Sequence, residues 1–225
     1  MTWSDLILRR RRRAQGQKGY YRFAHGLHKT SRTSIINHLI RRNRYRDYLE
    51  IGVHASDNFA HVLAANKLGV DPSARGPVDY ALTSDEFFAQ LPPERRFDLV
   101  FVDGLHEEEQ ALRDITNALR HLRDGGTVVV HDCNPPSEWH QRAFRGDDDL
   151  AWNGTTWRAW ARLRAERPDL RMHVVDTDWG VGILQRGRQE VHPLPPGARL
   201  DYAYLDRHRR ELLQLIGVEQ FLEEY

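Results

Sequence analysis

Two largely apolar runs near the middle of the 225-residue chain are each followed by ionisable side chains. Asp103 comes directly after the run 97–102, and His131 and Asp132 come directly after the run 126–130. An apolar run of this length is typical of a central parallel strand, which is buried on both faces. Ligands of parallel sheets bind at the carboxyl ends of the strands, so we expect these side chains to meet at one edge.

Shorter apolar segments alternate with segments of helical spacing along the rest of the chain. Strands are expected at 48–53, 68–71, 97–102, 126–130, 172–176 and 181–184. Two helices are expected to begin after N-caps at Thr33 and Thr83, and a third is expected to begin at Ser56. Further helices are expected over 107–122, ended by residues 124–126, over 160–170, and beyond residue 200. The short connection between the last two strands favours antiparallel pairing. The alternation predicts a doubly wound, mostly parallel, Rossmann-like α/β sheet with an antiparallel final strand.

The short apolar stretches and the single cysteine indicate a protein that lies in an aqueous and reducing compartment. No apolar stretch approaches the roughly 18 residues that a membrane-spanning helix needs, so no membrane span is expected. The single cysteine, Cys133, excludes an internal disulfide and a cysteine-based zinc site. We therefore expect a cytoplasmic protein with one domain of ordinary size.

The net charge of +1 conceals a strongly basic N-terminus. Residues 1–46 carry 13 lysine and arginine residues and one acidic residue, a formal charge of +12, which leaves −11 on the remainder. Such a leader could dock an anionic partner such as nucleic acid or lipid headgroups. It could equally be a solvated, flexible tail that contacts the acidic body of the same chain.

The ends of the first two expected strands indicate which cofactor the sheet binds. Glu50 and Gly52 end the first strand, and Asp71 ends the second. An acid about 20 residues beyond a glycine turn suits the hydroxyls of a ribose. No second glycine follows Gly52 that would let a pyrophosphate approach the backbone closely. This pattern argues against a dinucleotide and favours a cofactor with a ribose and no phosphates, such as S-adenosylmethionine.

Four short motifs then occur in order and at suitable spacing, at 50–52, 69–72, 101–106 and 131–135. Together they resemble the class I S-adenosylmethionine-dependent methyltransferases. The likeness is greatest to a bacterial branch with an Asp-Gly-x-His strand end, often tied to O-methylation of small molecules and polysaccharides. The resemblance covers roughly residues 46–185. Neither the leader nor the tail contributes to it. We therefore expect a basic leader with an N-terminal helix (1–46), a methyltransferase domain (47–190) and an amphipathic helical tail (191–225).

The resemblance also implies a role for individual positions in cofactor binding. These positions are Glu50, Gly52, Asp71, Ser84, Asp85 and Asp103. The first two would lie beside the methionine part of the cofactor, and Asp71 would bind the ribose hydroxyls. Ser84 and Asp85 would lie near the adenine, and Asp103 near the sulfonium. As alternatives, Glu50 could cap a helix and Asp71 could simply form a turn.

Two acids also resemble the metal-binding residues of catechol-type O-methyltransferases. Asp103 and Asp132, with the amide of Asn134, would form the oxygen-rich shell that Mg²⁺ prefers. Such an ion would acidify a substrate hydroxyl. His106 or His131 could serve as the general base, because neutral imidazole accepts a proton near pH 7. Alternatively, the acids organise hydrogen bonds and no metal takes part.

Four tryptophans follow the expected catalytic strands, namely Trp139, Trp152, Trp157 and Trp179. They could form a lid or a wall on which a sugar stacks, or they could simply pack in the core. The leader and the amphipathic tail could pair across a homodimer.

We therefore predict an enzyme that methylates a hydroxylated small molecule, either a sugar or a secondary metabolite. Three other functions stay open. A nucleic-acid methyltransferase would use the basic leader, although residues 134–137 lack the aromatic residue of the base-methylase motif. A nicotinamide-dependent oxidoreductase could use a similar sheet, and a binding module could use it without catalysis.

Overall fold

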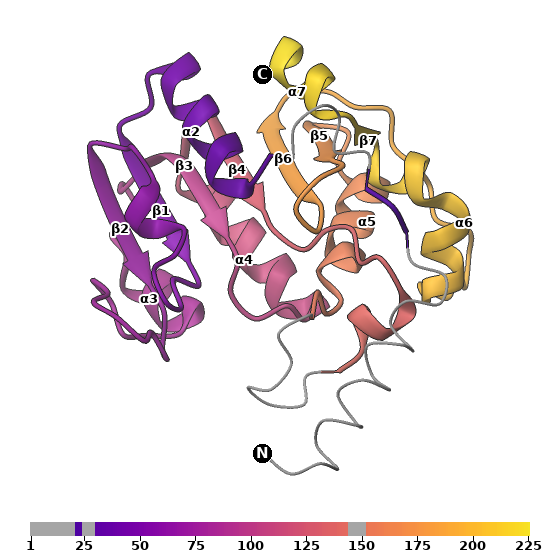
Figure 1. Cartoon of the computed structure of the whole chain (residues 1–225), viewed down its shortest axis with the longest axis horizontal. Helices are drawn as coiled ribbons and strands as arrows, with labels where there is room; N and C mark the ends of the chain where they lie inside the picture. Colours follow the sequence, from indigo (N-terminus) through magenta and orange to yellow (C-terminus); the bar gives the residue numbers. More distant parts are fainter. Residues whose placement is uncertain (1–20, 24–29, 144–151) are drawn as a thin grey trace.

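A mixed sheet of seven strands forms the centre of the molecule, in the order β2-β1-β3-β4-β6-β5-β7 (Figure 1). The computed structural model describes residues 21–23, 30–143 and 152–225. The strands are β1 (Asp47–Ile51), β2 (Asn66–Val70), β3 (Phe97–Val102), β4 (Leu122–Val130), β5 (Leu170–Val175), β6 (Val181–Arg186) and β7 (Leu215–Ile216). β6 runs antiparallel to both β4 and β5, whereas the other pairs are parallel. The predicted fold class is confirmed.

Helices cover both faces of this sheet. They are α2 (Arg32–Asn43), α3 (Ser84–Gln90), α4 (Glu108–Arg120), α5 (Thr156–Glu166), α6 (Tyr202–Leu213) and α7 (Val218–Glu224). α2 and α7 pack on one face, and α3 to α6 pack on the other. β4 shows why both faces must be covered: Val128 and Val130 point to one core and Val129 to the other, and all three are fully buried. Fully burying one such side chain stabilises the fold by roughly 1.5–3 kcal/mol.

α4 has the apolar spacing that the sequence predicts. Ala111, Ile115 and Ala118 are buried on one side of the helix, against the sheet. The capping box before α3 is confirmed as well, because Thr83 accepts from the Glu86 amide while the Glu86 carboxylate accepts from the Thr83 amide. The expected stop of α4 at 124–126 is wrong. The helix ends at Arg120, and 124–126 lie within an irregular part of β4.

The helix expected from Ser56 is also wrong. The chain between β1 and β2 contains only a 3-10 turn, η1 (Phe59–His61), and Leu63 is 60% exposed instead of packed. Asn37 of α2 holds this segment, since its amide nitrogen donates to the His61 carbonyl (2.9 Å) and its oxygen accepts from the Leu63 amide (2.8 Å). A side-chain amide thus supplies hydrogen bonds that a helix would have made internally.

Three other helix boundaries differ from those expected. α2 begins two residues early, because Ser31 rather than Thr33 is its N-cap. α5 ends at Glu166, so that Leu170 begins β5. The C-terminal tail is not one helix: Gln214 adopts a left-handed conformation after α6, and β7 then joins the sheet beside β5.

Among the residues that the structure describes, no helix is both long enough and apolar enough to cross a bilayer. The arginine run 9–13 lies outside these residues, so the two interpretations of the basic leader stay predictions.

Candidate functional site

The turn after β1 brings that strand end against the end of β3. Gly52 has a φ of +90°, and a Cβ atom added there would lie 2.1 Å from the carbonyl oxygen of Asp103. Only glycine allows this approach. His54 and Ser56 also have positive φ values, of 47° and 64°. The turn therefore has the left-handed backbone conformation of a glycine-rich loop at three positions, although only Gly52 is a glycine.

A pocket of about 450 Å³ opens at this turn. Its walls come from the start of α2, the end of β1 with the following turn, the end of β3, and the loop between β5 and β6. The lining residues are Thr30, Ser31, Arg32, Thr33, Glu50, Gly52, Val53, His54, Ala55, Asp57, Asn58, Asp103 and Asp178. Its volume is in the range of small-molecule and cofactor sites.

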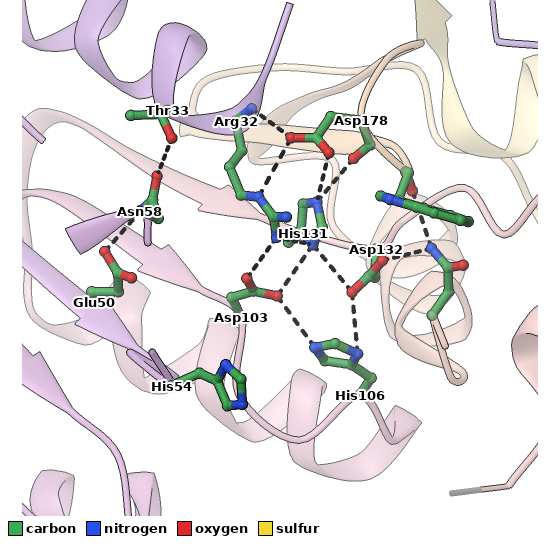
Figure 2. Close-up of polar contacts among 12 residues, drawn as sticks. Arg32, Thr33, Glu50, His54, Asn58, Asp103, His106, His131, Asp132 and Asp178 are labelled. Carbon is green, nitrogen blue, oxygen red and sulfur yellow. Dashed lines mark hydrogen bonds and ion pairs between the residues drawn. The ribbon is translucent and has the colours of Figure 1, made fainter. Parts of the chain in front are cut away.

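Glu50 is the buried carboxylate of this pocket. It accepts hydrogen bonds from the Tyr48 hydroxyl and from the Asn58 amide (2.8 Å), and Thr33 of α2 donates to the oxygen of that amide (2.8 Å; Figure 2). Burial raises the pKa of Glu50 to about 7, although both hydrogen bonds oppose the shift. Glu50 can therefore change its charge near neutral pH.

The other residues predicted to bind the cofactor lie beyond this pocket. The Asp71 carboxylate accepts from the backbone amides of His54 and Ser73, both at 2.7 Å, and so supports the pocket wall. Ser84 accepts from Gln110, and Asp85 is paired with an arginine of α4. Of the predicted cofactor residues, the pocket thus collects Glu50, Gly52 and Asp103 but not these three.

Four predicted residues do come together at the carboxyl ends of β3 and β4 (Figure 2). Asp103 Oδ1 lies 3.2 Å from both His106 Nε2 and His131 Nδ1. Asp132 Oδ2 lies 3.1 Å from both His106 Nδ1 and His131 Nδ1. We call Asp103, His106, His131 and Asp132 the rim cluster.

Residues that the sequence analysis did not assign complete the surroundings of the rim cluster. Asn153 donates to Asp132 Oδ1 (2.6 Å), which holds a residue whose own φ is +58°. Arg32 Nη1 lies 3.0 Å from Asp103 Oδ2 and 2.9 Å from His131 Nδ1. In the sequence Arg32 is one of the charges of the basic leader, and nothing in its local sequence marks it as part of a site.

The neighbours of each imidazole indicate which nitrogen carries hydrogen. His131 Nε2 faces the carbonyl oxygen of Asp178 (2.9 Å), which can only accept. His106 Nδ1 faces Asp132 and the carbonyl oxygen of Trp152 (3.3 Å), which also only accept. The other nitrogen of each ring faces a carboxylate as well, since His106 Nε2 and His131 Nδ1 each lie 3.2 Å from Asp103 Oδ1. Acceptors beside both nitrogens favour the protonated form of each ring.

Opposite charges dominate the electrostatics of the rim cluster. Burial alone would raise the pKa of Asp103, but the charge of His131 and hydrogen bonds from both histidines hold it well below its usual range. Burial would lower the pKa of both histidines, yet Asp132 and Asp103 raise it. Raised pKa values keep both imidazoles protonated to higher pH, and they make each ring a stronger base once it is neutral.

The predicted ligand Asn134 does not reach the rim cluster. Its amide nitrogen donates to Asp176 (3.1 Å), and its oxygen accepts from Arg209. Within the described part of the chain, one atom each of Asp103, His131 and Asp132 lie within 4.8 Å of one another and could share an ion. This mixed nitrogen and oxygen set differs from the all-oxygen shell expected, and suits a transition metal at least as well as Mg²⁺.

The tryptophans divide between the core and the site. Trp157 is fully buried and packs in the core. Trp152 stacks on the His106 ring, with ring centres 5.0 Å apart, and Trp179 lies 6.3 Å from Phe23. Trp152 therefore covers one catalytic candidate, whereas Trp157 has the structural role that was the alternative.

Comparison with known proteins gives one family and many similar folds. The family described as "Methyltransferase domain" matches residues 18–133, just over half of the chain. No curated protein sequence matches the chain.

Three similar crystal structures illustrate the fold. A protein from Klebsiella pneumoniae, provisionally described as an O-methyltransferase, is 16% identical, with a TM-score of 0.51 over 79% of this chain and 89% of that one. A methyltransferase from Podospora anserina with bound S-adenosylhomocysteine is 15% identical, with a TM-score of 0.51 over 70% and 80%. A Staphylococcus aureus protein, provisionally described as a caffeoyl-CoA O-methyltransferase, is 14% identical, with a TM-score of 0.50 over 83% and 93%. At these identities the similarity establishes the fold.

Proposed function

Since the chain belongs to the family of methyltransferase domains, we propose that it transfers a methyl group from S-adenosylmethionine to a hydroxyl group of a small molecule. One observation carries this proposal. Asp103 lines the pocket at the end of β1 and is also a member of the rim cluster at the ends of β3 and β4. A cofactor in the pocket and an acceptor at the rim cluster would therefore meet at this residue.

The pocket suits the zwitterionic methionine part of S-adenosylmethionine, which supplies an electrophilic methyl group on its sulfonium. In this proposal the ionised Glu50 pairs with the ammonium, and the Ser31 hydroxyl at the start of α2 donates to the carboxylate. Asp71 lies one strand further out and binds the ribose. The binding positions proposed for Ser84 and Asp85 follow from the family resemblance alone.

The acceptor hydroxyl loses its proton to the rim cluster. We assign this step to His106, because its side chain is 18% exposed whereas that of His131 is 3% exposed. In its neutral form His106 accepts the proton, and the carboxylates of Asp103 and Asp132 beside its two nitrogens stabilise the imidazolium that forms. Asn153 fixes Asp132, and the Trp152 ring shields the imidazole from water. The acceptor oxygen must lie in line with the methyl–sulfur bond, which is mainly a demand on position.

Asp103, His131 and Asp132 would hold a divalent cation, which would supply a Lewis acid for the acceptor hydroxyl. The proton transfer to His106 does not depend on it.

Calorimetric titration with S-adenosylmethionine, S-adenosylhomocysteine and NAD⁺ tests the cofactor. We expect the first two to bind and NAD⁺ not to bind. Asp71→Asn should weaken S-adenosylmethionine binding by about tenfold through a lost ribose hydrogen bond. Asp79→Asn is the matched control, since Asp79 also accepts from a backbone amide (Gly69, 2.7 Å) but, unlike Asp71, makes no hydrogen bond to the pocket-lining residue His54.

Binding of NAD⁺ in place of S-adenosylmethionine would favour the oxidoreductase and overturn the proposal. The methyl acceptor is then sought by transfer of labelled methyl groups to sugars, phenols and other hydroxylated metabolites. The cytoplasmic location and the homodimer remain predictions from the sequence.

A further inference from the structure

We infer that the Arg32 guanidinium is the resident cation of the rim cluster, and that a divalent cation binds Asp103, His131 and Asp132 only after Arg32 has left them. This inference does not rest on methyl transfer, because it concerns the occupancy of the cluster by positive charge.

Arg32 already contacts two of the three residues that could share an ion. Its Nη1 lies 3.0 Å from Asp103 Oδ2 and 2.9 Å from His131 Nδ1 (Figure 2). Figure 2 shows the guanidinium beside the His131 ring, between Asp178 and Asp103. It thus lies next to two of the groups that could hold an ion.

A metal ion and the Arg32 guanidinium would compete for the same place. Arg32 Nη1 lies within 3.0 Å of Asp103 Oδ2 and His131 Nδ1, and Nδ1 is the His131 nitrogen that faces the cluster, because Nε2 faces the Asp178 carbonyl. An ion shared by Asp103, His131 and Asp132 would therefore need the position that the guanidinium occupies. The guanidinium also adds a positive charge beside the carboxylate of Asp103, which further opposes a second cation.

Asp178 anchors Arg32 in this position. Its carboxylate accepts from the Arg32 backbone amide (2.7 Å) and lies 3.4 Å from Arg32 Nε. The amide is the first of α2, so the helix N-terminus and the side chain hold the same carboxylate. Arg32 also lines the 450 Å³ pocket and its side chain is 31% exposed, so it has room to withdraw from the cluster.

Binding of Mn²⁺ to the full chain, followed by the electron paramagnetic resonance signal of the free ion, tests this inference without any turnover. We expect Arg32→Gln to bind Mn²⁺ at least about tenfold more tightly than the wild type. Arg32→Lys, which keeps a positive charge, should restore weak binding. Arg41→Gln removes an exposed arginine from the same helix and should leave the affinity unchanged.

A double variant locates the ion. Adding Asp132→Asn to Arg32→Gln should abolish the gain, because Asp132 is a ligand candidate with no Arg32 hydrogen bond. Thermal melting of each variant confirms that it is folded. Equal Mn²⁺ affinities of wild type and Arg32→Gln, or no binding by either folded protein, would overturn the inference. Neither result would affect S-adenosylmethionine binding, so the proposed function is tested separately.

Discussion

Glu50 and Asp103 end neighbouring strands of the same sheet, yet their carboxyl groups are shifted in opposite directions. The two strand ends are joined by a hydrogen bond from the Asp103 amide to the Ile51 carbonyl (2.8 Å). The pKa of Glu50 is raised to about 7, whereas that of Asp103 lies well below its usual range. Burial pushes both pKa values upward, so burial does not explain the difference.

The partners of the two carboxylates explain it. Glu50 is contacted by a hydroxyl and an amide, which are neutral. Asp103 is contacted by the guanidinium of Arg32 and by two imidazoles that its own charge helps to protonate. Neutral hydrogen-bond donors only partly offset the free-energy cost of burying a carboxylate, so the pKa stays raised. Neighbouring cations more than offset this cost, so the pKa falls. The carboxyl group of Glu50 at the end of β1 can therefore gain or lose its proton near pH 7, whereas that of Asp103 after β3 stays ionised.

The largest expected effect comes from removing the charge of Asp103. Asp103→Asn removes the carboxylate that Arg32 and His131 share in a mostly buried place. Removing one partner of such a pair costs roughly 3–5 kcal/mol. We expect a loss of roughly 4 kcal/mol in the free energy of unfolding in urea at pH 7, together with a loss of methyl transfer.

Asp169→Asn is the control for this variant. Asp169 also pairs with an arginine, Arg167, but its side chain is 57% exposed. Its removal should change the unfolding free energy by less than about 1 kcal/mol. Equal effects of the two variants would mean that the ionic environment of Asp103 contributes nothing.

The next effect concerns Glu50 and depends on pH. Because its pKa is raised from 4.5 to about 7, the folded state holds the proton more tightly than the unfolded state does. Its contribution to stability is therefore full below pH 4.5 and is lost as the pH rises to about 7. The loss is roughly 3 kcal/mol, from the size of the shift.

Glu50→Gln removes this titration. The unfolding free energy of the variant relative to wild type should therefore rise by roughly 3 kcal/mol between pH 4.5 and pH 8, in urea titrations at both values. A difference between the two proteins that does not change with pH would contradict the raised pKa of Glu50.

The contrast between the two strand ends also shows what a sequence can predict. The strands, the sheet class and the placing of Asp103, His131 and Asp132 at one edge follow from apolar runs and from topology, and are confirmed. So is the assignment to the methyltransferases, which used short motifs in order. These features are local or depend only on strand order.

Apart from helix boundaries, the failures depend on long-range contacts. Arg32 is 71 residues from Asp103, and Asn37 replaces an expected helix with hydrogen bonds to a segment 24 residues away. Asn134 lies close after the end of β4, as the predicted ligand should, but its amide pairs with Asp176 and with Arg209 of α6 instead. No periodicity or spacing in the sequence reports such pairings.

The smallest expected effect concerns the backbone of the turn that leads from β1 to the pocket. Ser56 has a φ of +64°, which costs a residue with a Cβ atom roughly 1 kcal/mol. Ser56→Gly removes this strain but adds flexibility to the unfolded chain, so a net gain of about 0.5 kcal/mol is expected by urea unfolding. Ala55→Gly, next to it and without a positive φ, should instead lose about 0.5–1 kcal/mol. A loss of stability in both variants would mean that the turn carries no strain at Ser56, and that serine is as well suited to it as glycine.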